Sequence, residues 1–376
     1  MLGKISNLKP KKIVLTGGHA ATTALAVVEE LIRRNQIDPS WDIYWIGAKK
    51  AIEGKNIPTL ESQIFPKIGV AHHHIIAGRI QRNFTLWTIP SLAKIPFGFL
   101  HALQILFKIK PNVILSFGGY AAFPVVVVGW IMHIPVVIHD QTSVFGRTNR
   151  FSAPFAKKIA LARNESKKYF NNKKVVVVGN PILTQIAGIG VKDKPGIPPT
   201  LYISCGSRGS IAINNLLEKI INVLLKKFIV IHQTGYLDYE KIKKVRSDLP
   251  KNLRDRYEIY ISIDPMQLDG VYKRADIIIA RAGANTVSEI ISIKRPAILI
   301  PLPFAYQDEQ LKNAQIAEKL GIAKILKQDE LTPNKLLSEI NNTYKNWRKI
   351  VSKAKDGDID DKLAAGKLVN LLKEVC

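Results

Sequence analysis

The sequence of 376 residues lacks the features that cross-link, export or disorder a chain. Its two cysteines, Cys205 and Cys376, lie far apart and cannot form a disulfide framework, so a reducing compartment is the simplest interpretation. Glycine (24) and proline (20) are near average, which excludes a collagen or low-complexity protein. The basic N-terminus carries no apolar segment and predicts no signal peptide.

Acidic residues are scarce. Asp plus Glu total 30 against 55 Lys plus Arg, which gives a formal net charge of +25. Such an excess favours anionic partners, namely nucleic acid, anionic lipid or phosphorylated small molecules. The lysines are spread along the whole chain, however, and a genomic bias would give the same pattern. Because no stacking-aromatic motif accompanies the charge, we expect no nucleic-acid partner.

A long uninterrupted apolar run is also missing. The best membrane candidate, residues 85–109, is interrupted by Pro90, Lys94, Pro96, His101 and Gln104. We therefore expect either a helix buried in a domain or a partly exposed apolar patch at a bilayer surface, and not a membrane span. The basic residues in and around it would suit anionic lipid heads: Arg79, Arg82, Lys94, Lys108 and Lys110.

What the chain does contain is an alternation of apolar strands and amphipathic helices. Strands are predicted at 13–16, 43–46, 113–117, 135–139, 158–161 and 175–178, and after a Gly/Pro-rich stretch at 201–204, 228–233, 257–261, 277–280, 297–301 and 323–326. Each half opens with a strand, a glycine turn and a helix (24–34, then 211–225). This predicts an α/β protein of two doubly wound domains with parallel sheets and a cleft between them. The expected boundaries are 1–187 and 198–360, with a last helix at 361–376 that could pack on the first domain.

Three polar segments follow strands of the first half. They are Thr16-Gly17-Gly18-His19, Gly118-Gly119-Tyr120, and the segment from His139 through Gln141 to Asn149. Glycine lets a backbone approach a ligand closely, and a helix N-terminus offers N–H groups to phosphate, so two such turns suggest a diphosphate. Tight structural turns would look the same. His19 could take a proton near neutral pH or simply cap the helix.

Three further segments lie in the second half. The turn 206–210, with Ser207, Arg208 and Gly209, suits a nucleotide diphosphate, although it is not a Walker A motif. Glu289 in segment 280–289 could accept ribose hydroxyls or stabilise a helix dipole. Gln310 and Asn313 lie one helical turn apart and suit sugar hydroxyls or a solvated face. The run His72-His73-His74 alternates faces in a strand, so we expect no metal site.

Taken together and in order, these motifs resemble the MurG family of peptidoglycan N-acetylglucosaminyltransferases, which have the GT-B fold. The resemblance runs from about Ile13 to Ala323. It rests on the segments above and on Gly179-Asn180-Pro181, Gly283-Ala284-x-Thr286-Val287-Ser288-Glu289 and Asp308-x-Gln310-x-x-Asn313-Ala314.

The resemblance implies a cytoplasmic-face peripheral membrane enzyme. It would transfer N-acetylglucosamine with inversion from UDP-N-acetylglucosamine, without a tightly bound cofactor, to the 4-hydroxyl of a polyprenyl-diphosphate-linked muramoyl-pentapeptide. His19 would be the catalytic base. The donor would be bound by Ser207, Arg208, Gly209, Ile263, Met266, Ala284, Asn285, Thr286, Glu289, Gln310 and Asn313. The acceptor would be bound by Thr16, Gly17, Gly18, Gly118, Gly119, Tyr120, His139, Gln141 and Asn149.

The sequence departs from the family pattern in places. Residues 20–23 replace a stretch that normally contains Pro, and Leu183 stands where an Arg is usual near the nucleotide. Because these changes lie mostly on the acceptor side, the alternatives are a GT-B transferase for another membrane glycolipid and a catalytically silent UDP-sugar-binding or lipid-binding scaffold. A NAD-dependent dehydrogenase is disfavoured, since neither opening turn reads Gly-x-Gly-x-x-Gly.

Overall fold

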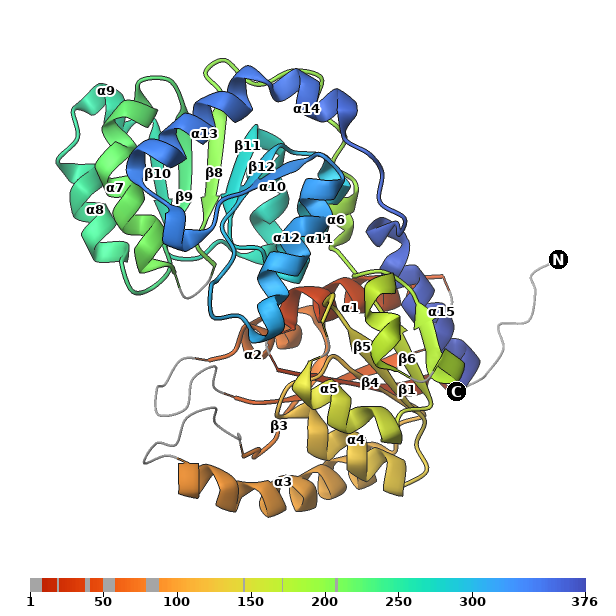
Figure 1. Ribbon diagram of the computed structural model, residues 1–376. Coiled ribbons are helices and arrows are strands. Elements are labelled where there is room, and N and C mark those ends of the chain that lie inside the picture. The colour runs from red at the N-terminus through yellow and green to blue at the C-terminus, as the bar shows by residue number, and fades with distance from the viewer. Residues whose placement is uncertain are drawn as a thin grey trace. The chain divides into compact units, whose positions relative to one another are not determined.

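A computed structural model describes residues 9–18, 20–37, 41–49, 58–78, 88–144, 146–170, 172–206 and 209–376, with side chains from 94 onward in the helix that begins at Thr88. The chain forms two compact units (Figure 1). The first unit comprises the residues up to Leu183 together with Asp361–Cys376, and the second comprises Thr184–Asp360.

The first unit contains a seven-stranded parallel sheet in the order β3-β2-β1-β4-β5-β6-β7. The strands are β1 (Lys11–Gly17), β2 (Trp41–Gly47), β3 (Ala71–His74), β4 (Val113–Ser116), β5 (Val136–Asp140), β6 (Lys158–Leu161) and β7 (Val175–Val177). The chain starts at the centre, runs outward to β3, and returns to β4 beside β1. The strand order therefore reverses between β1 and β4, which is where ligands bind in doubly wound sheets.

Helices cover both faces of this sheet. They are α1 (Ala21–Asn35), α2 (Leu60–Ile64), α3 (Thr88–Ile109), α4 (Ala122–Ile131), α5 (Arg147–Ser152) and α15 (Ala364–Val375). Ile13, Val14 and Leu15 of β1 are fully buried, as the uniformly apolar strands predict. The C-terminal helix α15 packs against α1, and a buried ion pair of 2.6 Å between Arg163 and Asp361 fastens the start of this terminal segment.

The second unit repeats this plan with six parallel strands in the order β10-β9-β8-β11-β12-β13. They are β8 (Thr200–Ser204), β9 (Ile229–Gln233), β10 (Tyr257–Tyr260), β11 (Ile277–Ala280), β12 (Ala297–Leu299) and β13 (Ala323–Ile325). Its helices are α6 (Thr184–Ala187), α7 (Ile211–Leu225), α8 (Tyr239–Ser247), α9 (Lys251–Arg254), α10 (Leu268–Arg274), α11 (Ala284–Ile293), α12 (Glu309–Lys319), α13 (Pro333–Lys345) and α14 (Trp347–Lys353). Here the order reverses between β8 and β11.

These two sheets confirm the predicted class of two doubly wound α/β domains. Every predicted strand is present, with ends shifted by at most two residues. β3 is not among the strands predicted from apolar runs, because its sequence, Ala71-His72-His73-His74, contains none; strand geometry was used there only to argue against a metal site.

The division between the units differs from the expected boundaries. The first unit ends at Leu183, and the Gly/Pro-rich stretch belongs to the second unit. Two hydrogen bonds explain why: Lys192 Nζ donates to Asp276 Oδ1 at 2.7 Å, and Arg295 donates to the Gly190 carbonyl at 3.2 Å. A composition typical of linkers therefore marks a segment that is bound to one domain.

The region considered as a membrane candidate forms α3, with Pro96 inside it. Within the ranges that the structure describes, no helix has the length and apolarity to cross a bilayer. One stripe of α3 is exposed and apolar: Phe97, Leu100, Leu103 and Phe107 are 43–66% exposed. The opposite side packs on α4, with Ala102 and Leu106 fully buried. This is the partly exposed patch that the sequence offered as one of two options.

Candidate active site

The two glycine turns of the first unit meet where its strand order reverses. The N–H of Gly18 donates to the Gly118 carbonyl at 2.9 Å, and the N–H of Phe117 donates to the Thr16 carbonyl at 2.8 Å. Gly119 has a φ of +93°, and a Cβ there would lie 2.7 Å from the Gly18 nitrogen. Only glycine permits this approach. The two turns therefore contact each other, and the Gly18 N–H is bound to the other turn.

Three buried polar atoms around these turns lack a partner among the described residues. They are Thr16 Oγ1, His139 Nδ1 and Asn149 Oδ1. The His139 ring is held through Nε2 by the Gly179 carbonyl at 2.9 Å, and the Asn149 amide donates to Asp140 Oδ2 at 3.0 Å. Unpaired buried polar atoms are uncommon and indicate a missing water or ligand. Two other predicted acceptor residues, Tyr120 and Gln141, lie close to these turns in the sequence, and both are half-buried.

Glu61 is a residue of this region that the sequence analysis missed. It lies on α2, is 4% exposed, and borders a small cavity of about 10 Å³ together with Gly17, Gly18 and Tyr120. Burial raises the pKa of its carboxyl, against the opposing effect of hydrogen bonds that include one from the Ala20 backbone. Because α1 has no acidic residue in its first turn, Glu61 supplies a carboxylate at that helix N-terminus. No motif marks it.

Three predicted residues lie outside the described ranges: His19, Ser207 and Arg208. Their roles stay predictions. Leu183, which stands at the position of the family's usual Arg, is described and is 1% exposed.

In the second unit, α7 follows β8 and α11 follows β11, so both helices begin at the point where the strand order reverses. Their N-caps, Ser210 and Gly283, make no side-chain cap hydrogen bond within the described residues. Gly209 has a φ of +86°, and a Cβ there would meet the Thr234 carbonyl oxygen at 2.5 Å. Two helix N-termini at one sheet edge suit an anionic ligand. Ala284, Asn285 and Thr286 form the first turn of α11.

Arg281 belongs to the segment 280–289 but was not predicted as a site residue. It follows β11 directly, and its guanidinium donates to Ser210 Oγ at 2.6 Å and to the Ile300 carbonyl at 3.1 Å. It therefore places a positive charge beside the start of α7 and ties two strand ends together. Its place directly after an apolar strand was the available signal.

Glu289 lies on α11 and is 5% exposed. The Tyr272 hydroxyl donates to Glu289 Oε2 at 2.7 Å. Burial raises the pKa of Glu289 to about 7, and the Tyr272 hydrogen bond acts in the opposite direction. Glu289 is thus a buried carboxylate whose charge changes near neutral pH. It lies beyond the first turn of α11, so stabilising the dipole there is the weaker interpretation.

Gln310 and Asn313 both bind loops at the carboxyl ends of strands. Gln310 Oε1 accepts from the Leu302 N–H at 3.0 Å, and Asn313 Nδ2 donates to the Ala282 carbonyl at 3.3 Å. The predicted uracil neighbours follow β10: Ile263 is half-buried, and Met266 is 41% exposed. The residues predicted to bind the donor, where the structure describes them, therefore lie in the connections that follow β8, β10, β11 and β12.

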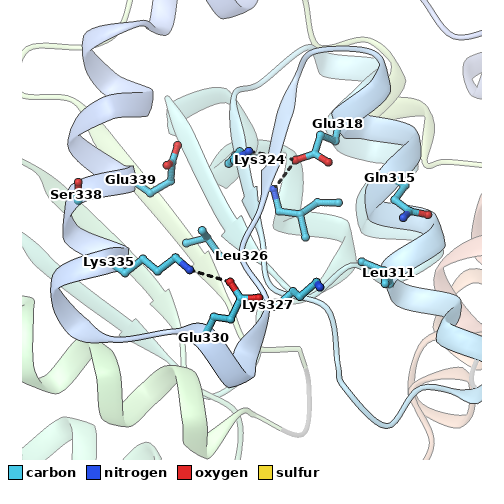
Figure 2. A pocket seen from close by; sticks show the side chains of 11 residues that line it. Leu311, Gln315, Glu318, Lys324, Leu326, Lys327, Glu330, Lys335, Ser338 and Glu339 are labelled. Atoms are coloured by element: carbon cyan, nitrogen blue, oxygen red, sulfur yellow. Dashed lines mark hydrogen bonds and ion pairs between the residues drawn. The ribbon is translucent and has the colours of Figure 1, made fainter.

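A larger cavity of about 650 Å³ contains none of the predicted residues (Figure 2). It lies on the edge strand β13, with side chains from α12 and α13 around it. Its lining carries both lysines and glutamates, and two ion pairs join them: Lys335 with Glu330 at 2.9 Å, and Lys324 with Glu318 at 3.7 Å. Glu318 also accepts from the Ile325 N–H of the edge strand at 3.1 Å. The lysines of this groove are balanced by glutamates, and Glu318 already occupies a backbone N–H of the edge strand. The groove therefore does not suit a diphosphate.

The histidine run provides no further ligand cluster. Burial lowers the pKa of His72 to about 4, and the His72 and His74 rings lie on one face, 4.5 Å apart. In the part of the chain that the structure describes, no group of three or more His, Cys, Asp or Glu side chains could hold a metal ion.

Comparison with known proteins extends over nearly the whole chain. Residues 15–161 match the glycosyltransferase family 28 N-terminal domain, and residues 200–366 match its C-terminal domain. A "UDP-N-acetylglucosamine--N-acetylmuramyl-(pentapeptide) pyrophosphoryl-undecaprenol N-acetylglucosamine transferase" of Lachnoclostridium phytofermentans is 30% identical over 97% of this chain and 99% of its own length. A protein of the same name from Clostridium botulinum is 31% identical over 93% of this chain and 96% of its own length.

Among solved structures, MurG of Acinetobacter baumannii covers 97% of this chain and 100% of its own, with a TM-score of 0.65 and 24% identity. That similarity shows the fold. With both domain models matched and relatives that are at least 30% identical along nearly their full length, the chain belongs to glycosyltransferase family 28 and, within it, to the MurG family of GT-B glycosyltransferases.

Proposed function

We propose that this protein transfers N-acetylglucosamine from UDP-N-acetylglucosamine to the 4-hydroxyl of a polyprenyl-diphosphate-linked muramoyl-pentapeptide. The observation that carries the proposal is that each unit, taken by itself, places its motifs at the same point of its sheet. In each, the motifs that resemble the family lie where the strand order reverses. The full-length relatives named for this reaction support the same assignment.

The donor belongs to the second unit in this proposal. The N-termini of α7 and α11 receive the diphosphate, with Arg281 beside them and Ser207 and Arg208 assigned by the motif. Glu289 accepts the ribose hydroxyls, Ile263 and Met266 lie against the uracil, and Gln310 and Asn313 face the sugar. The main task of the two helix N-termini and the arginines is to stabilise the negative charge that develops on the departing UDP.

The acceptor belongs to the first unit. The acceptor diphosphate lies at the paired glycine turns, where the buried Thr16 Oγ1 and Asn149 Oδ1 have no partner among the residues that the structure describes. The Asn149 oxygen accepts from an acceptor hydroxyl or a water, and the Thr16 hydroxyl can donate to a phosphate oxygen. His19 removes the proton of the 4-hydroxyl as that oxygen attacks the anomeric carbon, and UDP leaves from the opposite face, which inverts the configuration.

A second candidate, a transferase for a different membrane glycolipid, is favoured by one observation. A carboxyl group, Glu61 of α2, already borders the first glycine turn, and the Gly18 N–H of that turn is bound to the Gly118 carbonyl. Both features oppose an anion at that turn. An acceptor with a differently placed phosphate would avoid them.

The protein also meets a membrane surface in this proposal, on the cytoplasmic face. The α3 stripe of Phe97, Leu100, Leu103 and Phe107 enters the interface, and Lys108 and Lys110 contact anionic lipid heads. Lys110 lies over the Phe107 ring, 5.6 Å from its centroid, so charge and apolar surface are adjacent.

The test is turnover by the full-length protein in detergent with UDP-N-acetylglucosamine and the lipid-linked muramoyl-pentapeptide. We expect acceptor-dependent release of UDP, and we expect His19→Ala to abolish it while UDP binding remains. UDP binding without turnover on this acceptor, but with turnover on another glycolipid, would select the second candidate. Binding without turnover on any glycolipid would indicate a silent binder.

A further inference from the structure

Tyr272 is a buried side chain that connects two helices beneath the proposed donor site. It lies on α10, is 2% exposed, and donates its hydroxyl hydrogen to Glu289 Oε2 of α11 at 2.7 Å. The residues are 17 apart in sequence, so the contact depends on the packing of the two helices and not on helical spacing. A hydrogen bond to a buried carboxylate is among the stronger ones in proteins.

The Tyr272 ring is itself held in place. It meets the ring of Tyr202 from β8 edge-on, with centroids 5.7 Å apart and an interplanar angle of 81°. The Tyr202 hydroxyl donates to Gln233 Oε1 at 3.2 Å, so its position is fixed too. This chain of contacts from β9 through β8 to α10 sets where the Tyr272 hydroxyl lies, and hence the rotation of the Glu289 carboxylate.

Accepting two ribose hydroxyls makes two demands on a carboxylate: it must be ionised, and its plane must be fixed. Burial opposes ionisation of Glu289, whereas the Tyr272 hydroxyl favours it. The titratable groups that face Glu289 in the described structure are Tyr272 on α10 and Tyr202 on β8, and neither carries a positive charge. The tyrosine hydroxyl is therefore the group that meets both demands.

We propose that Tyr272 is a positioning residue for donor recognition: it holds the Glu289 carboxylate in the orientation that accepts the ribose hydroxyls of the uridine nucleotide. This inference rests on the proposed function, because it takes Glu289 as the ribose ligand. Tyr272 touches neither the sugar nor the reacting atoms in this scheme. It acts on affinity for the nucleotide through Glu289.

The test compares binding of UDP and 2′-deoxy-UDP to the full-length protein by calorimetry at pH 7.5. Tyr272→Phe removes only the hydroxyl. We expect it to weaken UDP binding about tenfold and 2′-deoxy-UDP binding much less, so that the preference for ribose falls, because the loss of one hydrogen bond to a charged group costs roughly that factor. The pH below which UDP binding is lost should also rise. Glu289→Gln should remove most of the same preference, and the double variant should lose little more.

The matched control is Tyr257→Phe, which removes another buried tyrosine hydroxyl of the second unit, one bound to His232 at 2.9 Å. It should leave the ratio of UDP to 2′-deoxy-UDP affinity unchanged. If Tyr272→Phe weakens both nucleotides equally, or neither, while Glu289→Gln alters the ratio, the Tyr272 inference is wrong and the donor assignment stands. If Glu289→Gln leaves the ratio of UDP to 2′-deoxy-UDP affinity unchanged, or if the wild type binds no UDP, Glu289 is not the ribose ligand. The Tyr272 inference is then wrong as well.

Discussion

At the scale of single residues, the proposed donor site is marked by an unfavourable burial. Glu289 is 5% exposed, and burial raises its pKa to about 7. The Glu289 carboxyl accepts a hydrogen bond from the Tyr272 hydroxyl. It lies on the helix that follows β11, and β11 is one of the two strands between which the strand order reverses. A carboxylate held there is suited to hydroxyl groups of a ligand.

This burial predicts the sign of a pH effect on stability. A carboxyl with a raised folded-state pKa stabilises the fold below its unfolded pKa, near 4.5, and loses that contribution as pH rises through about 7. Glu289→Gln removes the titration. We expect its melting temperature relative to wild type to increase from pH 5 to about pH 7 and to level off at higher pH, measured by calorimetry. A difference independent of pH would show that the Glu289 carboxyl does not titrate in this range.

A second prediction at this scale concerns the acceptor turns. Gly119→Ala places a methyl group 2.7–3.1 Å from the Gly18 backbone at a φ of +93°, so the two turns must separate. We expect turnover to fall at least tenfold with UDP affinity unchanged. Gly69→Ala is the control, because it has a similar φ of +81° but nothing within 4 Å of the new Cβ. Equal loss of turnover in both variants would mean that the effect is general destabilisation.

At the scale of elements, α3 is the segment whose placement has the clearest consequence. One side packs on α4 and the other presents four large apolar side chains. Singly exposed apolar residues are ordinary, but a stripe at helical spacing with lysines at its end is typical of an interfacial helix.

We therefore expect Phe97→Ser with Phe107→Ser to reduce sedimentation with vesicles that contain anionic lipid by roughly tenfold or more, since each phenylalanine contributes about 1.5–3 kcal/mol when buried. Val223 on α7 is 46% exposed, and Val223→Ser serves as the control that should sediment like wild type. Unchanged sedimentation of the α3 variant would place the membrane contact elsewhere.

The elements also show what sequence patterns can and cannot predict. Apolar runs such as 158–161 predict buried parallel strands because both faces of the sheet are covered. Apolar runs do not predict β3, because three of its four residues are histidines. The pairing of Tyr272 with Glu289 and the position of Glu61 beside Gly17 depend on how helices pack, which residue spacing along the chain does not encode. Arg281, by contrast, could have been predicted as a site residue from its place directly after an apolar strand.

At the scale of the whole molecule, the two units repeat one plan, and the motifs lie at equivalent places in both. The resemblance of the sequence to the MurG family followed from the order of those motifs, and the family is established by the full-length relatives. The central claim of the proposed function is that the chain transfers the sugar directly from the nucleotide donor, bound in the second unit, to the lipid-linked acceptor, bound in the first.

The most direct test is one reaction in which wild-type protein, UDP-N-acetylglucosamine and the lipid-linked muramoyl-pentapeptide are incubated in detergent, and UDP and lipid-linked disaccharide are both quantified. The account predicts equal amounts of the two products, a β linkage, and no UDP when the acceptor is omitted. Release of UDP without disaccharide, or at the same rate without acceptor, would contradict it.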